Sequence, residues 1–204
     1  SILTIQGHDT MNEEQKTVVL TGASRGIGHA TVKRFNDAGW RVLTCSREVF
    51  DSRCPWPGGK KNHIQVDLSD PKSTIEATDE IKDKLDGKLC ALINNAGVSP
   101  KLVDGQRLNS LETELKIWHQ VFQVNFFAPI LLAKALKSEL ERAKGAIVNV
   151  TSIAGSRVHP FAGAAYSTSK SALATLTREM AYDFGPLGVR VNSIAPGDCL
   201  LYTS

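Results

Sequence analysis

Short apolar segments alternate with amphipathic helical segments along almost the whole chain, and no other feature of the sequence restricts the fold as strongly. The apolar segments, each of which we expect to form a strand, are residues 17–20, 41–45, 63–66, 89–93, 145–150 and 189–194. They are nearly continuous, as expected for strands that helices cover on both faces. Such alternation predicts an α/β fold, a doubly wound parallel sheet in three α/β/α layers.

Residues with strong positional preferences mark the ends of two expected helices. Gly39 follows an amphipathic stretch, and glycine often ends a helix because it readily adopts a left-handed conformation. Asp70 and Pro71 precede another such stretch. Aspartate is a favoured N-cap and proline suits the first turn, so we expect a helix to begin directly after Asp70.

Composition and charge exclude several classes of function. The net charge of +3 is small and evenly spread, so we expect no nucleic-acid partner and no membrane association. The N-terminal residues lack the pattern of a signal peptide. The four cysteines contain no C-x-x-C pair and the five histidines no H-E-x-x-H motif, so we expect no metal site, free thiols and a cytoplasmic location.

A glycine-rich segment, TGASRGIG at 21–28, directly follows the first strand and opens the first helix. In this context Gly22 allows a tight turn, Gly26 lets the backbone approach a pyrophosphate, and Gly28 lets helix and strand pack closely. The helix N-terminus offers free N–H groups and a positive dipole end to phosphates. The segment therefore predicts a dinucleotide site on a Rossmann fold.

The end of the second strand favours NADP over NAD. An acidic residue there would bind the adenosine ribose hydroxyls, but this chain has Ser46 and Arg47 instead. A hydroxyl and a guanidinium suit a 2′-phosphate. Arg25, inside the glycine-rich segment, would add a second cation, whereas Glu48 would weaken the effect of Arg47.

A second group of polar residues is expected near the same edge of the sheet. Tyr166 and Lys170 stand four residues apart on one helical face, where an ammonium favours the phenolate form and makes tyrosine usable as an acid-base group. Ser152 follows the fifth strand and residues 94–97 the fourth. Asn125 interrupts an otherwise apolar helix, which is costly unless its amide has partners.

The combination resembles the short-chain dehydrogenase/reductase family, in particular its NADP-preferring ketoreductases. The resemblance extends from Lys16 to Gly197. The matching residues are TGASRGIG at 21–28, Asp67 and Leu68, NNAG at 94–97, Asn125, Ser152, YSTSK at 166–170, and Pro196 with Gly197.

The resemblance implies an oxidoreductase that transfers a hydride between NADP(H) and a small carbonyl or alcohol substrate. Tyr166 would be the acid-base group, Ser152 would orient the substrate oxygen, Lys170 would favour the phenolate and bind the nicotinamide ribose, and Asn125 would hold a water in a proton relay. The implied cofactor-binding residues are Gly22, Ser24, Arg25, Gly26, Ile27, Gly28, Ser46, Arg47, Asp67, Leu68, Asn95, Ala96, Gly97, Tyr166, Lys170, Pro196 and Gly197. The apolar segment 126–136 would pair subunits into a homodimer or homotetramer, although as bare sequence it is more simply the buried face of a helix.

Two features depart from the family pattern. The spacing from Ser152 to Tyr166 is one residue longer than usual, and we expect a bulge within 156–164 to absorb the difference. The loop at 98–115 is longer than in fatty-acid-type ketoreductases. Because it borders the active site, we expect it to affect the choice of substrate more than the chemistry.

We expect one dinucleotide-binding domain over residues 16–198, since the chain length fits a single core. Residues 1–15 would form an N-terminal extension. Within it Met11 would be the true start, so that residues 1–10 would be untranslated upstream sequence.

At the other end, the sequence suggests a truncation. Members of the family continue after the corner at 196–197 into a substrate lid and a seventh strand, and we expect both to be missing. Residues 199–204 read CLLYTS, one frame of TGTCTCTTATACACATCT, a transposon-end adaptor used in sequencing libraries. We therefore expect this tail to be non-native.

Three other interpretations stay open at this point. Ser152 could be a hydrolase nucleophile, but it lacks a G-x-S-x-G elbow and a histidine placed by motif. The chain could bind NADP(H) as a sensor without turnover, although a sensor has no need of a tuned phenol. It could also be a catalytically incompetent fragment. His159 and Phe161 are equally compatible with substrate contact and with ordinary packing.

Overall fold

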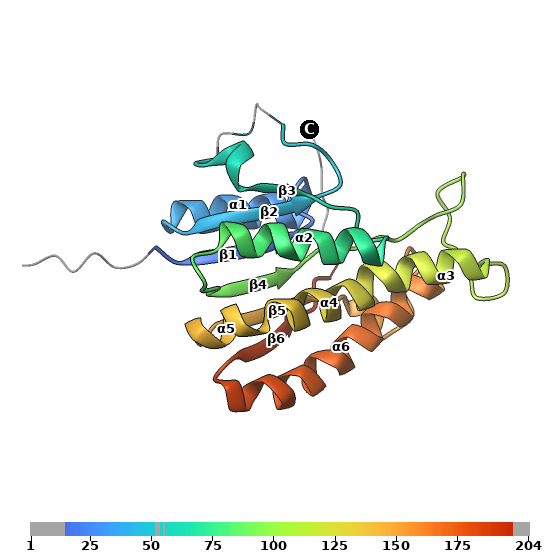
Figure 1. The fold of residues 1–204 in the computed structure, drawn as a ribbon. Coiled ribbons are helices and arrows are strands. Elements are labelled where there is room, and N and C mark those ends of the chain that lie inside the picture. The colour runs from blue at the N-terminus through green and yellow to red at the C-terminus, as the bar shows by residue number, and fades with distance from the viewer. Residues whose placement is uncertain (1–14, 52–53, 55, 198–204) are drawn as a thin grey trace, which may run out of the picture.

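The computed structural model describes residues 15–51, 54 and 56–197. It contains a six-stranded sheet in the order β3-β2-β1-β4-β5-β6, in which every neighbouring pair is parallel. This confirms the predicted doubly wound sheet, drawn in Figure 1. The strands are β1 (Thr17–Thr21), β2 (Arg41–Ser46), β3 (His63–Gln65), β4 (Ala91–Asn94), β5 (Ala146–Val150) and β6 (Arg190–Ile194).

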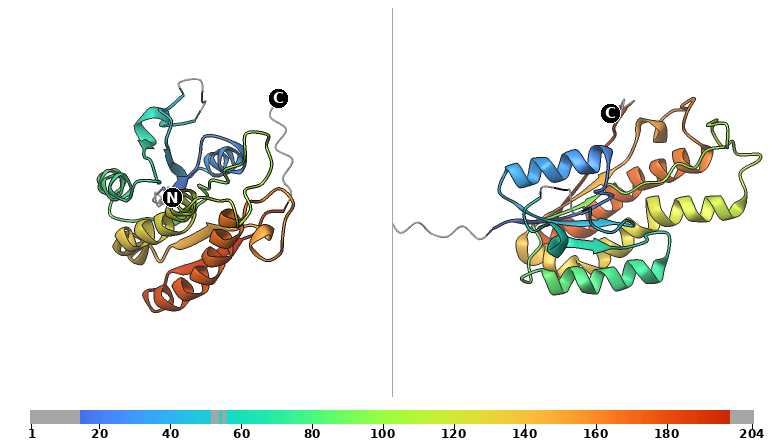
Figure 2. Two further views of the ribbon diagram at one scale, coloured as in Figure 1. Left: turned by 90° about the vertical axis from the view of Figure 1, so that its right-hand side faces the viewer. Right: turned by 90° about the horizontal axis from the view of Figure 1, so that it is seen from above.

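Helices lie on both faces of the sheet, with α1 on one face and α2, α4, α5 and α6 on the other, as Figure 2 shows. The α-helices are α1 (Gly26–Asp37), α2 (Pro71–Lys84), α3 (Leu115–Phe122), α4 (Ala128–Ala135), α5 (Lys137–Ala143) and α6 (Ala164–Phe184). A π-helical turn, η2 (Gln123–Phe127), joins α3 to α4, and three short 3-10 turns are η1 (Gly59–Asn62), η3 (Ile153–Gly155) and η4 (Gly185–Leu187). None of the helices in this part of the chain is long and apolar enough to cross a membrane.

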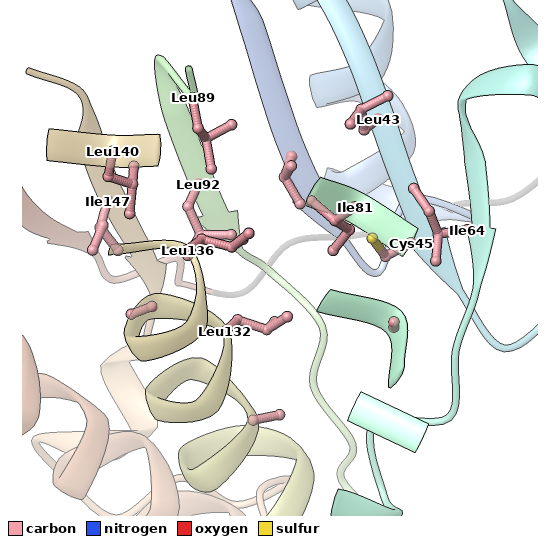
Figure 3. Close-up of a cluster of buried hydrophobic side chains, with 14 of the residues drawn as sticks. Leu43, Cys45, Ile64, Ile81, Leu89, Leu92, Leu132, Leu136, Leu140 and Ile147 are labelled. Carbon is pink, nitrogen blue, oxygen red and sulfur yellow. The ribbon is translucent and has the colours of Figure 1, made fainter. Parts of the chain in front are cut away.

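The apolar core consists of two clusters separated by the sheet. In the larger one, Leu43, Leu92 and Ile147 of the strands pack against Ile81 of α2 and Leu132 of α4, as Figure 3 shows. All five side chains are fully buried. Burying one such side chain adds about 1.5–3 kcal/mol to the free energy of unfolding. Burial on both faces therefore explains the continuous apolar runs of β1, β2 and β4, whereas the edge strand β6 buries only Val191.

The predicted helix ends are confirmed at both positions. The Asp70 carboxylate accepts a hydrogen bond of 2.9 Å from the Lys72 N–H, and Pro71 begins α2. Gly39 lies just beyond α1 with a φ of +77°.

The predictions about the two ends of the chain fall on residues that the structure does not describe. Residues 1–14 and 198–204 are outside the described ranges, and they include most of the predicted extension and the whole predicted non-native tail. In the described part of the chain, β6 pairs with β5 alone and forms one edge of the sheet.

Candidate active site

A cleft of about 1120 Å³ lies at the carboxyl ends of the strands. Segments that follow β1, β2, β3, β4, β5 and β6 all contribute to its lining. The strand order reverses between β1 and β4, and ligands of open α/β sheets bind at such a switch point. The topology therefore explains why residues far apart in sequence meet here.

The glycine-rich segment forms the floor of the cleft. Gly22 and Gly26 have φ values of +68° and +55°, which favour glycine over residues with a side chain. A Cβ atom on Gly28 would lie 1.9 Å from the Gly22 carbonyl oxygen, so only glycine fits there. Helix α1 begins at Gly26 without a side-chain cap or an acidic residue in its first turn, which leaves its N-terminus available to an anion.

Hydrogen bonds hold the segment after β4, residues 95–96, against the glycine-rich segment. The Thr21 hydroxyl oxygen accepts bonds from the Asn95 and Ala96 N–H groups at 3.1 and 3.0 Å. The Asn95 amide donates to the carbonyl oxygens of Thr21 and Gly22 at 3.1 and 2.9 Å. This arrangement fixes the two loops that face each other across the floor of the cleft.

One end of the cleft carries the predicted adenosine-binding residues. Ser46 and Arg47 follow β2, and Asp67 and Leu68 follow β3. The N–H and hydroxyl of Ser69 donate to the Asp67 carboxylate at 2.9 and 2.7 Å. These bonds, helped by the positive charge of Arg47, hold the pKa of Asp67 below its ordinary value.

Tyr166, Lys170 and Ser152 line the other end of the cleft. Tyr166 is in the first turn of α6 and Lys170 one turn later, with the ammonium nitrogen 5.8 Å from the centre of the tyrosine ring. That nitrogen donates a 2.6 Å bond to the Val150 carbonyl oxygen, and burial lowers the pKa of Lys170 to about 8. The Ser152 oxygen accepts a bond of 3.2 Å from the Ala154 N–H, so its hydroxyl proton is still available to a ligand.

Asn125 does not line the cleft but lies fully buried behind it, in η2. Its amide nitrogen donates to the Val98 carbonyl oxygen and the Ser169 hydroxyl, each at 3.0 Å, and its oxygen accepts from the Val98 N–H at 2.8 Å. Both amide protons are therefore used within the protein. The predicted water relay stays a prediction. Because the Asn125 side chain has no free proton to donate, a water beside it would have to donate a hydrogen bond to an oxygen of Asn125.

A buried polar chain connects the centre of the sheet to α6. The Asn94 amide donates to the Asn149 oxygen at 2.8 Å, and the Asn149 amide donates to the Thr177 hydroxyl at 2.9 Å. Because Tyr166 and Lys170 belong to the same helix as Thr177, these bonds help to hold α6 against β4 and β5.

All predicted site residues except Asn125 lie on the lining of this cleft. Four residues of the site were not predicted from the sequence. Val98 itself lines the cleft, whereas Thr21, Ser169 and Thr177 support the lining residues from behind. Thr21 lies inside the glycine-rich segment and Ser169 inside the YSTSK segment, and these positions could have indicated that both belong to the site. Among the described residues, no group of three or more His, Cys, Asp or Glu side chains is arranged to hold a metal ion.

Comparisons with known proteins agree with this architecture. A family model described as "short chain dehydrogenase" matches residues 16–203. Over 187 residues the chain is 59% identical to Protein FixR of Bradyrhizobium diazoefficiens. This alignment covers 91% of this chain and 67% of that protein. The chain is 34% identical to meso-2,3-butanediol dehydrogenase of Serratia marcescens, with coverages of 91% and 72%.

A solved structure is also closely similar. It is the crystal structure of an oxidoreductase of the short chain dehydrogenase/reductase family from Brucella ovis, in complex with a partially ordered NAD. The superposition has a TM-score of 0.86 at 66% sequence identity and covers 90% of this chain and 83% of that one.

Proposed function

Because this chain belongs to the short-chain dehydrogenase family and is an oxidoreductase, we propose that it transfers a hydride between NADP(H) and a small carbonyl or alcohol substrate. One observation carries the proposal. The Ser152, Tyr166 and Lys170 side chains lie together at one end of a cleft whose floor is an uncapped helix N-terminus.

The residues of the cleft fit a nicotinamide dinucleotide. The N-terminus of α1 has no side-chain cap, and the glycines beside it would not tolerate a Cβ atom. These groups would hold the pyrophosphate, with Asp67 and Leu68 at the adenine and Lys170 at the nicotinamide ribose. When bound, the reduced nicotinamide supplies the hydride that adds to the carbonyl carbon.

The proton that balances the hydride comes from the protein. In the direction of reduction, the Tyr166 hydroxyl donates its proton to the substrate oxygen, and a solvent proton then restores the phenol. The Ser152 hydroxyl donates a hydrogen bond to the same oxygen and fixes its position. The Lys170 ammonium stabilises the phenolate that is left on Tyr166.

We propose NADP as the preferred cofactor because of Arg47 and Arg25. Both line the cleft, and among the described residues neither guanidinium forms an ion pair. Each is thus available to a 2′-phosphate, for which a guanidinium fork is well suited. The solved relative from Brucella ovis has NAD bound, so the preference of this chain has to be measured.

Replacing Arg47 with aspartate is expected to reverse the cofactor preference. The change removes the cation and adds a carboxylate that repels the 2′-phosphate and accepts bonds from ribose hydroxyls. We expect the ratio of kcat/KM for NADPH over NADH to fall by roughly 100-fold, about the effect of losing one charged contact. An unchanged ratio of kcat/KM for NADPH over NADH would show that Arg47 does not bind the 2′-phosphate.

Turnover itself separates the proposed enzyme from a cofactor-binding sensor. With saturating NADPH and a panel of 3-oxoacyl, sugar and cyclic ketones, at least one ketone should cause loss of the NADPH absorbance. Tight NADPH binding without absorbance loss for any member of the panel would favour the sensor.

We also propose that the protein is a homodimer or homotetramer that pairs through the segment 126–136. Phe127 in this segment is 46% exposed, and the Phe126 and Phe127 rings meet edge to face at 5.2 Å. Sedimentation velocity would measure the assembly, and a monomer at micromolar concentration would contradict it.

A further inference from the structure

We propose that Lys101 makes the enzyme select carbonyl substrates that carry an anionic group, a carboxylate or a phosphate. The inference rests on the proposed function, because it requires the end of the cleft near Tyr166 to receive the substrate. It assigns a role to the long loop between β4 and α3, which the catalytic residues do not use.

The backbone around Lys101 is ordered by hydrogen bonds. Lys101 and Arg107 form an isolated antiparallel bridge. The Leu102 N–H donates to the Gln106 carbonyl oxygen at 3.0 Å, and the Gly105 N–H donates to the Leu102 carbonyl oxygen at 2.9 Å. The loop is thus a small hairpin, and Gly105 has the φ of +82° that its tight turn requires.

The hairpin lies beside the segment that precedes α6, as both views in Figure 2 show. The Ala164 N–H donates to the Leu108 carbonyl oxygen at 2.9 Å, which ties the two segments together. The Lys101 ammonium lies 6.0 Å from the centre of the Phe161 ring, within the range of a cation–π contact. Lys101 and Phe161 line the same cleft as Ser152 and Tyr166, so the proposal places the ammonium beside the space that the substrate would occupy.

The carboxylates of the lining lie at one end of the cleft, where Arg25 and Arg47 accompany them. The carboxylates among the lining residues are Glu48 and Asp67, which follow β2 and β3 at the adenosine end. At the other end, Lys101 forms no ion pair with any described residue. Its charge is therefore uncompensated inside a concave site, where it attracts anions most strongly.

A second lysine near the same end of the molecule shows a different environment. Lys116 in α3 pairs with Glu114 at 2.9 Å, its side chain is 72% exposed, and it is not among the lining residues. Lys101 is also exposed, so the two lysines differ in the ion pair and in their position relative to the cleft. Lys116 is therefore a matched control for the charge of Lys101.

The experiment compares two pairs of ketones in which one member carries an anionic group and the other is neutral. The first pair is 3-oxobutanoate and its methyl ester, and the second is dihydroxyacetone phosphate and dihydroxyacetone. In each case the carbonyl gains a hydride from NADPH and a proton, and an alcohol forms. For the wild type, Lys101→Gln and Lys116→Gln, kcat/KM is measured at saturating NADPH. The Kd of each ketone is measured by calorimetry with NADP⁺-loaded protein, which cannot reduce it.

We expect the wild type to prefer the anionic member of at least one pair by tenfold or more, less so at high salt. The pair that shows the preference tells carboxylate from phosphate. In Lys101→Gln the ratio should fall close to one, whereas Lys116→Gln should keep the wild-type ratio.

Two results would overturn the inference. One is equal use of the anionic and neutral members by the wild type in both pairs. The other is a preference that survives in Lys101→Gln while the variant retains the wild-type Kd for NADPH. Failure of the proposed function would be seen separately, as absence of turnover for every ketone, and the Kd values would then decide whether an anion binds preferentially.

Discussion

Replacing Tyr166 with phenylalanine should lower kcat by about 10²–10⁴-fold, the usual contribution of a positioned acid-base group. The phenol lines the substrate end of the cleft, and the Lys170 ammonium is 5.8 Å from its ring. Phenylalanine keeps the ring and its packing but has no proton to give to the substrate oxygen. The Kd for NADPH, measured by fluorescence titration, should stay within about twofold of the wild-type value, a change of under 1 kcal/mol.

A second tyrosine on the same helix provides the control. Tyr182 belongs to α6 but is 82% exposed and does not line the cleft, so Tyr182→Phe should turn over normally. Full activity in Tyr166→Phe would refute the proposed mechanism. A parallel loss of NADPH affinity in that variant would instead point to damage of the site.

The sequence predicts the fold well because the strands and helices are specified locally. Each predicted strand is present within two residues of its expected bounds, for example β1 at Thr17–Thr21 and β5 at Ala146–Val150. Burial on both faces of the sheet requires continuous apolar runs, which are easy to recognise. Asp70 also caps α2 as its residue type predicts, because that bond involves only its own neighbours.

The lining of the cleft is also predictable, since parallel strands deliver the segments after them to one edge. The supporting contacts are not. The bonds of Asn125 to Val98 and Ser169 depend on a π-helical turn, for which the sequence has no signal. The position of Lys101 over Phe161 depends on the packing of two loops that lie far apart in the chain.

The charged form of Lys170 is disfavoured by its buried position. Its side chain is nearly fully buried, and burial lowers its pKa from 10.5 to about 8. The Gly97 position beside it has no room to spare, since a Cβ there would lie 3.3 Å from the ammonium nitrogen. The buried charge therefore lowers stability, and the proposed role of Lys170 in the reaction would account for its presence there.

Replacing Lys170 with methionine should accordingly lower kcat/KM by roughly 10²–10³-fold, the loss typical of removing one preorganised electrostatic contact. Methionine keeps most of the volume of the side chain but can neither stabilise the phenolate nor bind the ribose. We expect the loss in both kcat and NADPH affinity, whereas Tyr166→Phe should affect kcat alone. Steady-state kinetics with a fluorescence titration of NADPH would separate the two patterns.

The same variant tests the low pKa through the pH dependence of stability. In the folded chain Lys170 loses its proton near pH 8, whereas in the unfolded chain it keeps it up to about 10.5. The unfolded state binds more protons between these values, so the free energy of unfolding rises with pH. Relative to Lys170→Met, the wild type should gain about 2 kcal/mol between pH 7.5 and 9.5. Urea unfolding at both pH values would measure this gain. Lys137→Met changes an exposed site on α5 and keeps Lys170, so it should show the same gain as the wild type. Parallel curves for the wild type and Lys170→Met would mean that folding does not perturb Lys170.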